Sequence, residues 1–338
     1  MEIIRKQAHA RAGLIGNPSD GYNGKTISIA IVNYRAQVVL YEWEDVEIIP
    51  SQEDHSRFDS ISDLVADVKL HGYYGGIRIV KATIKRFVEY CAEQGVSLHD
   101  RNFSIRYETN IPRQVGLAGS SAIVVATLRA LMEFYKVEIP QHVQPSLVLS
   151  VENMELGITA GLQDRVIQVY DGSVYMDFAA NRMFKDCGYE CGTYEYVESP
   201  LLAQLYVAFS TDVSEPTEVF HNNLRARFDS GEKAVVDAMT KFSSLAEQAR
   251  ASLLADDYDN LSKSIDENFD TRLSICQLPS EHVDMIQRAR RSGASAKFAG
   301  SGGAIIGTFR DDAMYTALTD DLAQIGCTVF KPQITSPE

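Results

Sequence analysis

The sequence predicts an α+β fold of two domains, and three observations support this. The chain has 338 residues, which suits two domains sharing a cleft better than one small module. Strand-like and helix-like stretches alternate irregularly, without the strict β-α-β-α order of a doubly wound sheet. From residue 222 onward the pattern changes to long helices. We expect the boundary in the irregular stretch near residues 190–200, which gives domains of residues 1–195 and 196–338.

The first part of the chain is predicted to mix strands and helices. Thr26–Val32 and Gln37–Tyr41 are β-branched and apolar, and a short polar break separates them, which predicts a β-hairpin or meander. Apolar residues recur at helical spacing in Ile61–Lys69 and in Gly75–Cys91, so we expect a helix in each. Asn102–Glu108 alternates like a strand.

The remaining elements follow from the same two periodicities. Ser120–Tyr135 has a clear helical pattern, Val143–Asn153 is also helical, and Gly172–Asp177 and Leu201–Phe209 have the composition of strands. After residue 222 we expect three long helices, at Glu232–Leu254, Tyr258–Leu273 and His282–Arg291. They are followed by a glycine-rich turn that enters a strand, at Lys297–Gly307, by a further helix at Asp311–Ile325 and by a short final strand at Thr328–Lys331.

Composition excludes several classes of function. The chain has 32 basic and 46 acidic residues, a net charge of −14 and a pI near 5.0, so it repels nucleic acid and anionic lipid at long range. Any phosphate that it binds must meet a local cradle. No apolar run approaches the length of a membrane span, and the N-terminus lacks the apolar centre of a signal peptide. The five scattered cysteines are typical of reduced thiols, and we expect a cytoplasmic protein with no nucleic-acid or membrane partner.

The sharpest local feature is a Gly/Ser-rich segment, Pro112–Ala122, that follows a strand and opens an apolar helix. Small residues let a ligand approach the backbone, and the free N–H groups of the helix's first turn favour an anion. The two hydroxyls there could cap the helix, contact phosphate oxygens or bind Mg²⁺. The segment therefore predicts a phosphate site, with a plain Gly-Ser N-cap as the alternative.

Three other segments carry groups suited to chemistry. Glu152–Arg165 contains acids that could hold a metal or handle a proton, with two solvated carboxylates as the alternative. Lys297–Ala304 is a second glycine-rich turn, in which we expect Lys297 to be solvated, with a phosphate contact as the alternative. Arg11–Asp20 reads as a strand ending in a polar turn whose Asn, Ser and Asp side chains could bind the hydroxyls of a polyol.

These four segments, in this order, resemble the signature motifs of the GHMP kinase superfamily. Within the superfamily, the sequences of these motifs are most similar to those of the branch that acts on glucuronate. The stretches that carry this resemblance are GNPSD (16–20), GYYGG (72–76), TNIPRQVGLAGSSAIV (109–124), ELGITAGLQDRVIQVY (155–170) and KFAGSGGA (297–304). The loop between Pro112 and the Ser120-Ser121 pair is one residue longer than the commonest superfamily form, which fits that branch.

The resemblance implies a ribosomal-S5-like N-terminal domain packed on a ferredoxin-like C-terminal domain. It also implies an ATP- and Mg²⁺-dependent sugar kinase that phosphorylates the anomeric hydroxyl of D-glucuronate to give glucuronate 1-phosphate. The alternatives are a heptose-7-phosphate kinase or other sugar 1-kinase of the superfamily, or a non-catalytic protein of this fold that only binds its ligand.

The same resemblance assigns roles to individual residues. Asp164 would be the catalytic base, with Arg11 against it, and Ser121 and Glu152 would bind Mg²⁺. The ATP-binding residues would be Pro112, Gly116, Leu117, Ala118, Gly119, Ser120, Ser121 and Ala122. The substrate-binding residues would be Asn17, Ser19, Asp20, Tyr74, Arg165, Ser301 and Gly302. Two alternatives stay open: Arg165 could be a structural ion pair while Arg113 meets the sugar's carboxylate, and Tyr74 could be a core residue.

Overall fold

The computed structural model describes residues 2–50, 75–210 and 218–335, with the side chains of 218–223 excepted. Its largest sheet runs in the order β3-β4-β2-β5-β8, and β1 also pairs with β2. The strands of this sheet are β1 (Ile3–Ile15), β2 (Lys25–Trp43), β3 (Glu47–Ile49), β4 (Asn102–Thr109), β5 (Ser173–Asp177) and β8 (Tyr194–Tyr196). The antiparallel β2 is the centre, because it pairs with β1, β4 and β5.

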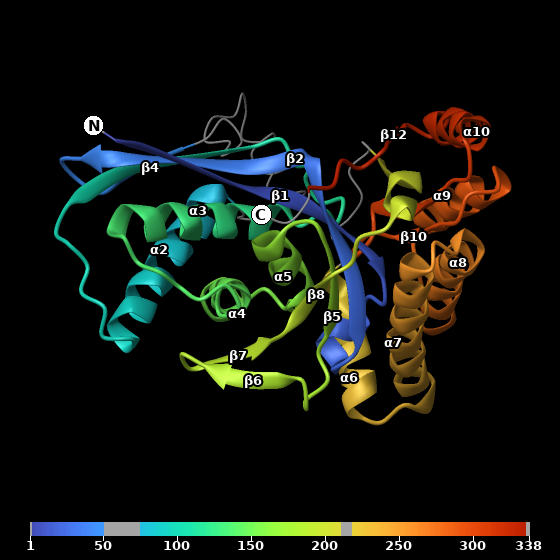
Figure 1. The fold of residues 1–338 in the computed structure, drawn as a ribbon, viewed down its shortest axis with the longest axis horizontal. Coiled ribbons are helices and arrows are strands. Elements are labelled where there is room, and N and C mark those ends of the chain that lie inside the picture. Colours follow the sequence, from blue (N-terminus) through green and yellow to red (C-terminus); the bar gives the residue numbers. More distant parts are fainter. Residues whose placement is uncertain (1, 51–74, 211–217, 336–338) are drawn as a thin grey trace, which may run out of the picture.

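Four helices cover one side of this sheet, as Figure 1 shows: α2 (Gly76–Glu93), α3 (Gly119–Tyr135), α4 (Gln144–Ser150) and α5 (Gln163–Tyr170). The central helix is α3, which packs on β1, β2 and α2. Its residues Ala122–Leu128 are all buried, as expected for a helix that is apolar on every side. A small hairpin of β6 (Met183–Asp186) and β7 (Tyr189–Gly192) follows.

The C-terminal half forms a second layer. Its sheet has the order β10-β11-β9-β12 and contains β9 (Leu205–Ser210), β10 (Lys297–Phe298), β11 (Ala304–Thr308) and β12 (Cys327–Phe330). Its helices, grouped at one end of the molecule in Figure 1, are α6 (Glu218–Asp229), α7 (Lys233–Leu254), α8 (Tyr258–Ile275), α9 (Ser280–Arg291) and α10 (Asp312–Ala323). The predicted α+β class is confirmed. The division at residue 195/196 stays a prediction.

The two sheets meet where β1 reaches the glycine-rich turn after β10. The Gly13 amide donates to the Ala299 carbonyl at 2.7 Å, and the Lys297 ammonium donates to the Gly13 carbonyl at 2.6 Å. Lys297 is only 1% exposed, so its predicted solvated position is wrong. Burial lowers the pKa of Lys297 well below its ordinary value, and the nearby charges of Arg272 and Arg11 lower it further.

The predicted hairpin at residues 26–41 is also wrong, because both segments belong to the single strand β2. The register with β1 shifts between His9 and Ala10, whose partners on β2 are Arg35 and Ile31. The polar break is therefore accommodated as a bulge rather than a turn. The long strand β1 pairs with both halves of β2 and keeps the chain extended.

Two further elements differ from expectation. The predicted strand 201–209 begins only at Leu205, because the Ser199 side chain caps a short 3₁₀ helix, Pro200–Gln204. The predicted helix 143–153 divides into α4 and a π-helical turn, Val151–Glu155. The expected helix at 61–69 lies outside the described residues. No helix in the described ranges is both long and apolar enough to cross a membrane.

Candidate active site

The Gly/Ser-rich segment leads into α3 as the phosphate hypothesis requires. Ala118, just before the helix, has a left-handed φ of 59°, and no side chain caps the helix. The serines of the first turn are thus not used as N-caps, and Ser121 instead donates its hydroxyl to Glu152. The Ala122 N–H donates to the Ala118 carbonyl at 3.2 Å, whereas the N–H groups of Gly119, Ser120 and Ser121 come before this first hydrogen bond of the helix, and the helix dipole adds positive potential there. The arrangement favours an anion over the plain capping alternative.

Glu152 and Ser121 form a compact oxygen pair below this helix end. Glu152 lies in the π-helical turn after α4 and is 1% exposed. Ser121 Oγ lies 3.0 Å from Glu152 Oε1 and 3.3 Å from Oε2. Adjacent oxygens around an octahedral Mg²⁺ with bonds of about 2.1 Å lie about 3.0 Å apart, so this donor set fits that ion in chemistry and spacing.

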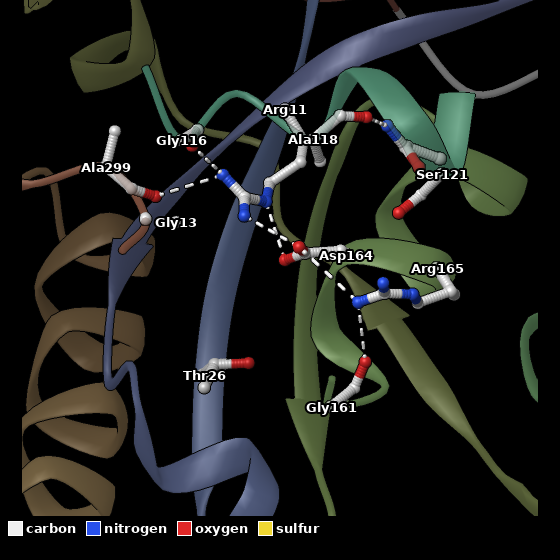
Figure 2. Close-up of polar contacts among 12 residues, drawn as sticks. Arg11, Gly13, Thr26, Gly116, Ala118, Ser121, Gly161, Asp164, Arg165 and Ala299 are labelled. Atoms are coloured by element: carbon white, nitrogen blue, oxygen red, sulfur yellow. Dashed lines mark hydrogen bonds and ion pairs between the residues drawn. The ribbon is translucent and has the colours of Figure 1, made fainter. Parts of the chain in front are cut away.

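Arg165 holds the other oxygen of Glu152. Its Nε donates to Oε2 at 2.5 Å, its Nη2 forms an ion pair with the same oxygen, and its Nη1 donates to the Gly161 carbonyl at 2.9 Å. Nη1 also lies 3.5 Å from Asp164 Oδ2. With most of its donors engaged inside the chain, Arg165 fits the structural ion pair better than a clamp on a substrate. Figure 2 shows its position between Gly161 and Asp164.

Arg11 and Asp164 form a two-point ion pair at the centre of the site (Figure 2). Arg11 Nε and Nη2 donate to the two Asp164 oxygens at 2.6 and 2.7 Å. Arg11 Nη1 donates to the Gly116 carbonyl and, at 3.4 Å, to the Ala299 carbonyl. One buried guanidinium thus connects β1, the phosphate loop, the start of α5 and the turn of the small sheet. Such a pair keeps the Asp164 carboxylate ionised and fixes its direction.

The two glycine-rich turns lie against each other. A Cβ on Gly116 would lie 2.7 Å from the Gly302 carbonyl oxygen, and one on Gly300 would lie 2.4 Å from the Gly116 carbonyl oxygen. Gly116 also has a positive φ of 75°. Only glycine permits this approach without strain. Ser301 lines the adjacent cleft, whereas Gly302 contributes its backbone to the contact between the turns.

The polar turn after β1 places Asp20 beside Asp164. Burial, and after it the charge of Asp164, raises the pKa of Asp20 from 3.8 to about 6, against the lowering effect of hydrogen bonds from the backbone N–H groups of Gln163 and Gly21. Gly161 leaves room for this carboxylate, because a Cβ there would lie 2.1 Å from Asp20 Oδ2. Asp20 is therefore a carboxyl group that can accept or donate a hydrogen bond near neutral pH.

Asn17 also faces the cleft, but Ser19 does not. Asn17 Oδ1 is buried and has no hydrogen-bond partner in the described part of the chain, which leaves it available to a ligand's hydroxyl. Ser19 is fully buried, and its hydroxyl donates to the Lys25 carbonyl at 3.1 Å, so it supports the turn. Gln163 Oε1, which sequence reasoning missed, is likewise buried, unpartnered among described residues and part of the cleft lining. Tyr74 lies outside the described residues.

These groups surround a cleft of about 390 Å³. Four arginines and two aspartates line it: Arg11, Arg165, Arg225, Arg272, Asp20 and Asp164. In a chain of net charge −14 this is a local excess of positive charge, which suits an anionic ligand.

Arg225, on α6, and Arg272, on α8, are cleft residues that sequence reasoning missed. For Arg272 a signal existed: it shares the buried face of α8 with Leu261, Ile265 and Phe269, where an apolar residue is expected. Arg225 follows an acidic stretch without a motif, and nothing local marks it.

Comparisons with known proteins identify the family of this chain. The model of the GHMP kinases N terminal domain matches residues 78–172. Probable glucuronokinase 2 of Arabidopsis thaliana is 43% identical, covering 90% of this chain and 84% of that protein. The D-glycero-alpha-D-manno-heptose 7-phosphate kinase of Campylobacter jejuni is 24% identical, covering 89% and 87%. The galactokinase structure of Lactococcus lactis, in complex with galactose, superimposes with a TM-score of 0.78 at 16% identity, covering 99% and 94%. The chain belongs to the GHMP kinase family.

Proposed function

We propose that this protein transfers the γ-phosphoryl group of ATP to the anomeric hydroxyl of D-glucuronate, giving glucuronate 1-phosphate. The relative at 43% identity supports the choice of sugar, since the heptose 7-phosphate kinase is far less similar. The observation that carries the chemistry is the Arg11–Asp164 pair, which lies in the cleft and contacts both glycine-rich turns.

Asp164 is the base in this proposal. It accepts the proton of the C1 hydroxyl as that oxygen attacks the γ-phosphorus, and the bond from phosphorus to the β-γ bridging oxygen breaks as ADP leaves. Arg11 keeps Asp164 ionised before the reaction and lies where negative charge develops on the transferred group. Both Asp164 oxygens bond to Arg11, so the carboxylate cannot rotate away from the sugar.

ATP binds along the segment from Pro112 to Ala122 in this proposal. Backbone N–H groups at the start of α3 hold the phosphates, and the tight approach at Gly116 leaves their path free of side chains. Ser121 and Glu152 would hold Mg²⁺, which neutralises phosphate charge. No group of three or more His, Cys, Asp or Glu side chains in the described ranges is placed to hold a metal, so the other ligands would be phosphate oxygens and water.

The sugar occupies the cleft between Asn17, Asp20 and Ser301. Asn17 Oδ1 and Gln163 Oε1 accept hydrogen bonds from ring hydroxyls, and Asp20 accepts or donates one according to pH. Such buried acceptors discriminate strongly against sugars that leave them unpaired.

A panel of sugars with ATP and Mg²⁺ tests the function. We expect ADP release with D-glucuronate, and little with galacturonate, galactose or a heptose 7-phosphate. Turnover with a neutral or phosphorylated sugar, and none with glucuronate, would keep the kinase and reject the uronic acid. Turnover with no sugar of the panel would reject the proposed substrate class.

A further inference from the structure

Three of the four arginines that line the cleft are already engaged. Arg11 is paired with Asp164 and Arg165 with Glu152. Arg272 donates to the carbonyls of Gly300 and Ser301, both at 2.9 Å, so it holds the glycine-rich turn. Of the arginines that line the cleft, only the fourth therefore remains as a charged partner for a ligand.

Arg225 is that fourth arginine, and its guanidinium is open to the cleft. It lies on the face of Tyr22, with its central carbon 4.3 Å from the ring centroid, and it donates through Nη2 to the Gly21 carbonyl. Figure 1 shows α6 beside the turn that holds Gly21 and Tyr22. These contacts fix the plane of the group in advance. In the described part of the chain, Nε has no hydrogen-bond partner and Nη1 has only the distant carboxylate of Asp229, at 3.8 Å.

The ion pair of Arg225 within the chain is weak. In the described part of the chain its one carboxylate partner is Asp229, at 3.8 Å, and the two side chains are 48% and 61% exposed. Exposed pairs of this kind contribute little. Among the described residues, the positive charge of Arg225 at the cleft is therefore only weakly compensated.

We propose that Arg225 binds the C6 carboxylate of the sugar and sets the preference for a uronic acid. The proposal rests on the proposed function and specifies which residue recognises the substrate's charge. In D-glucuronate the carboxylate is attached to C5, on the other side of the ring oxygen from C1, and so it lies away from the transferred phosphoryl group. The cleft residues follow the same sequence from the reacting end to the carboxylate end. The base Asp164 interacts with Asp20, and Gly21, the next residue in the chain, accepts a hydrogen bond from Arg225.

One planar guanidinium also matches a singly charged, planar carboxylate. A sugar phosphate carries up to two charges and three terminal oxygens, and it calls for more than one free cation. A neutral sugar needs none. The distribution of charge in the cleft therefore favours a uronic acid over either alternative.

Kinetics of Arg225→Gln with two substrates test the proposal. D-glucuronamide has the shape of D-glucuronate but no charge at C6. We expect the KM for glucuronate to rise about 10- to 100-fold in the variant, and the KM for glucuronamide to change little. The KM for ATP should stay the same. Arg225→Lys, which keeps the charge, should recover part of the loss.

Arg227→Gln is the matched control. Arg227 lies on the same helix but binds both oxygens of Glu232 and the Ile275 carbonyl, outside the cleft lining. The substitution Arg227→Gln should leave the KM for glucuronate unchanged. An equal rise for glucuronate and glucuronamide would show that Arg225 only supports the Gly21 turn, and an unchanged KM would exclude it from binding; both results overturn the proposal. If the wild-type protein turns over no glucuronate, the proposed function fails first.

Discussion

Asp164→Asn separates the charge of the proposed base from its size. Asparagine fills the same space beside Arg11 but does not take up a proton. Arg11 would keep its contacts with the Gly116 and Ala299 carbonyls, so the two glycine-rich turns should stay in place. Glu152 and the start of α3 are untouched, so ATP binding should change little.

The size of the effect follows from the geometry. Loss of a general base lowers kcat by about 10²- to 10⁴-fold. Leaving the buried Arg11 without its anion costs about 1–3 kcal/mol, less than for a fully buried pair, because Asp164 is 21% exposed. The charge of Asp164 also raises the pKa of Asp20. Removing this charge in Asp164→Asn therefore lowers the pKa of Asp20 and offsets part of the lost folding stability.

The assay is kcat and KM from ADP release, with ATP affinity by calorimetry and unfolding by urea. Asp171→Asn is the control, because Asp171 is 23% exposed, lies at the other end of α5 and pairs with His9 at 2.8 Å and Arg129 at 3.4 Å. It should lose stability but not kcat. A kcat for Asp164→Asn close to that of the wild type, or an equal fall in Asp171→Asn, would refute the assignment.

Three other changes test separate parts of the site. Gly116→Ala meets the Gly302 carbonyl and should weaken ATP binding, whereas Gly95→Ala, with a similar φ of 68° and nothing within 4 Å of a Cβ, should cost only about 1–2 kcal/mol of folding stability; equal ATP affinity in both variants would contradict the contact. Ser121→Ala should raise the Mg²⁺ concentration for half-maximal activity about 10-fold, since one oxygen ligand is lost, and an unchanged Mg²⁺ titration would remove this serine from the metal site. Asp20 has a pKa raised to about 6 from 3.8, so its effect on folding is favourable below pH 3.8 and is lost as the pH rises through 6. Asp20→Asn should therefore gain about 1–3 kcal/mol relative to the wild type between pH values of about 4 and 7, as measured by urea unfolding, and a difference that does not vary with pH would count against the shift.

Local pattern predicted most of the elements around the site. The helix α3 follows from an apolar run after small residues, and the long helices α7 and α8 follow from their spacing. The pattern failed at β2, where a polar break resembles a turn. Only pairing with β1, which is set by tertiary structure, decides that the chain continues.

The site itself was predictable only in part. Arg11 and Asp164 were connected by resemblance to a family, because a separation of 153 residues leaves no local trace of their ion pair. Lys297 was misplaced for the same reason, since its acceptor Gly13 belongs to another sheet. Arg225 and Arg272 reach the cleft from helices whose relation to the motifs is purely spatial.

The most direct test of the account is the structure of the product made from D-glucuronate, ATP and Mg²⁺. We predict a single phosphorus resonance that couples to the anomeric proton, with one ADP formed for each phosphate transferred. A phosphate on any other oxygen would contradict Asp164 as the base for the C1 hydroxyl, and ADP formation without a sugar phosphate would contradict the kinase itself.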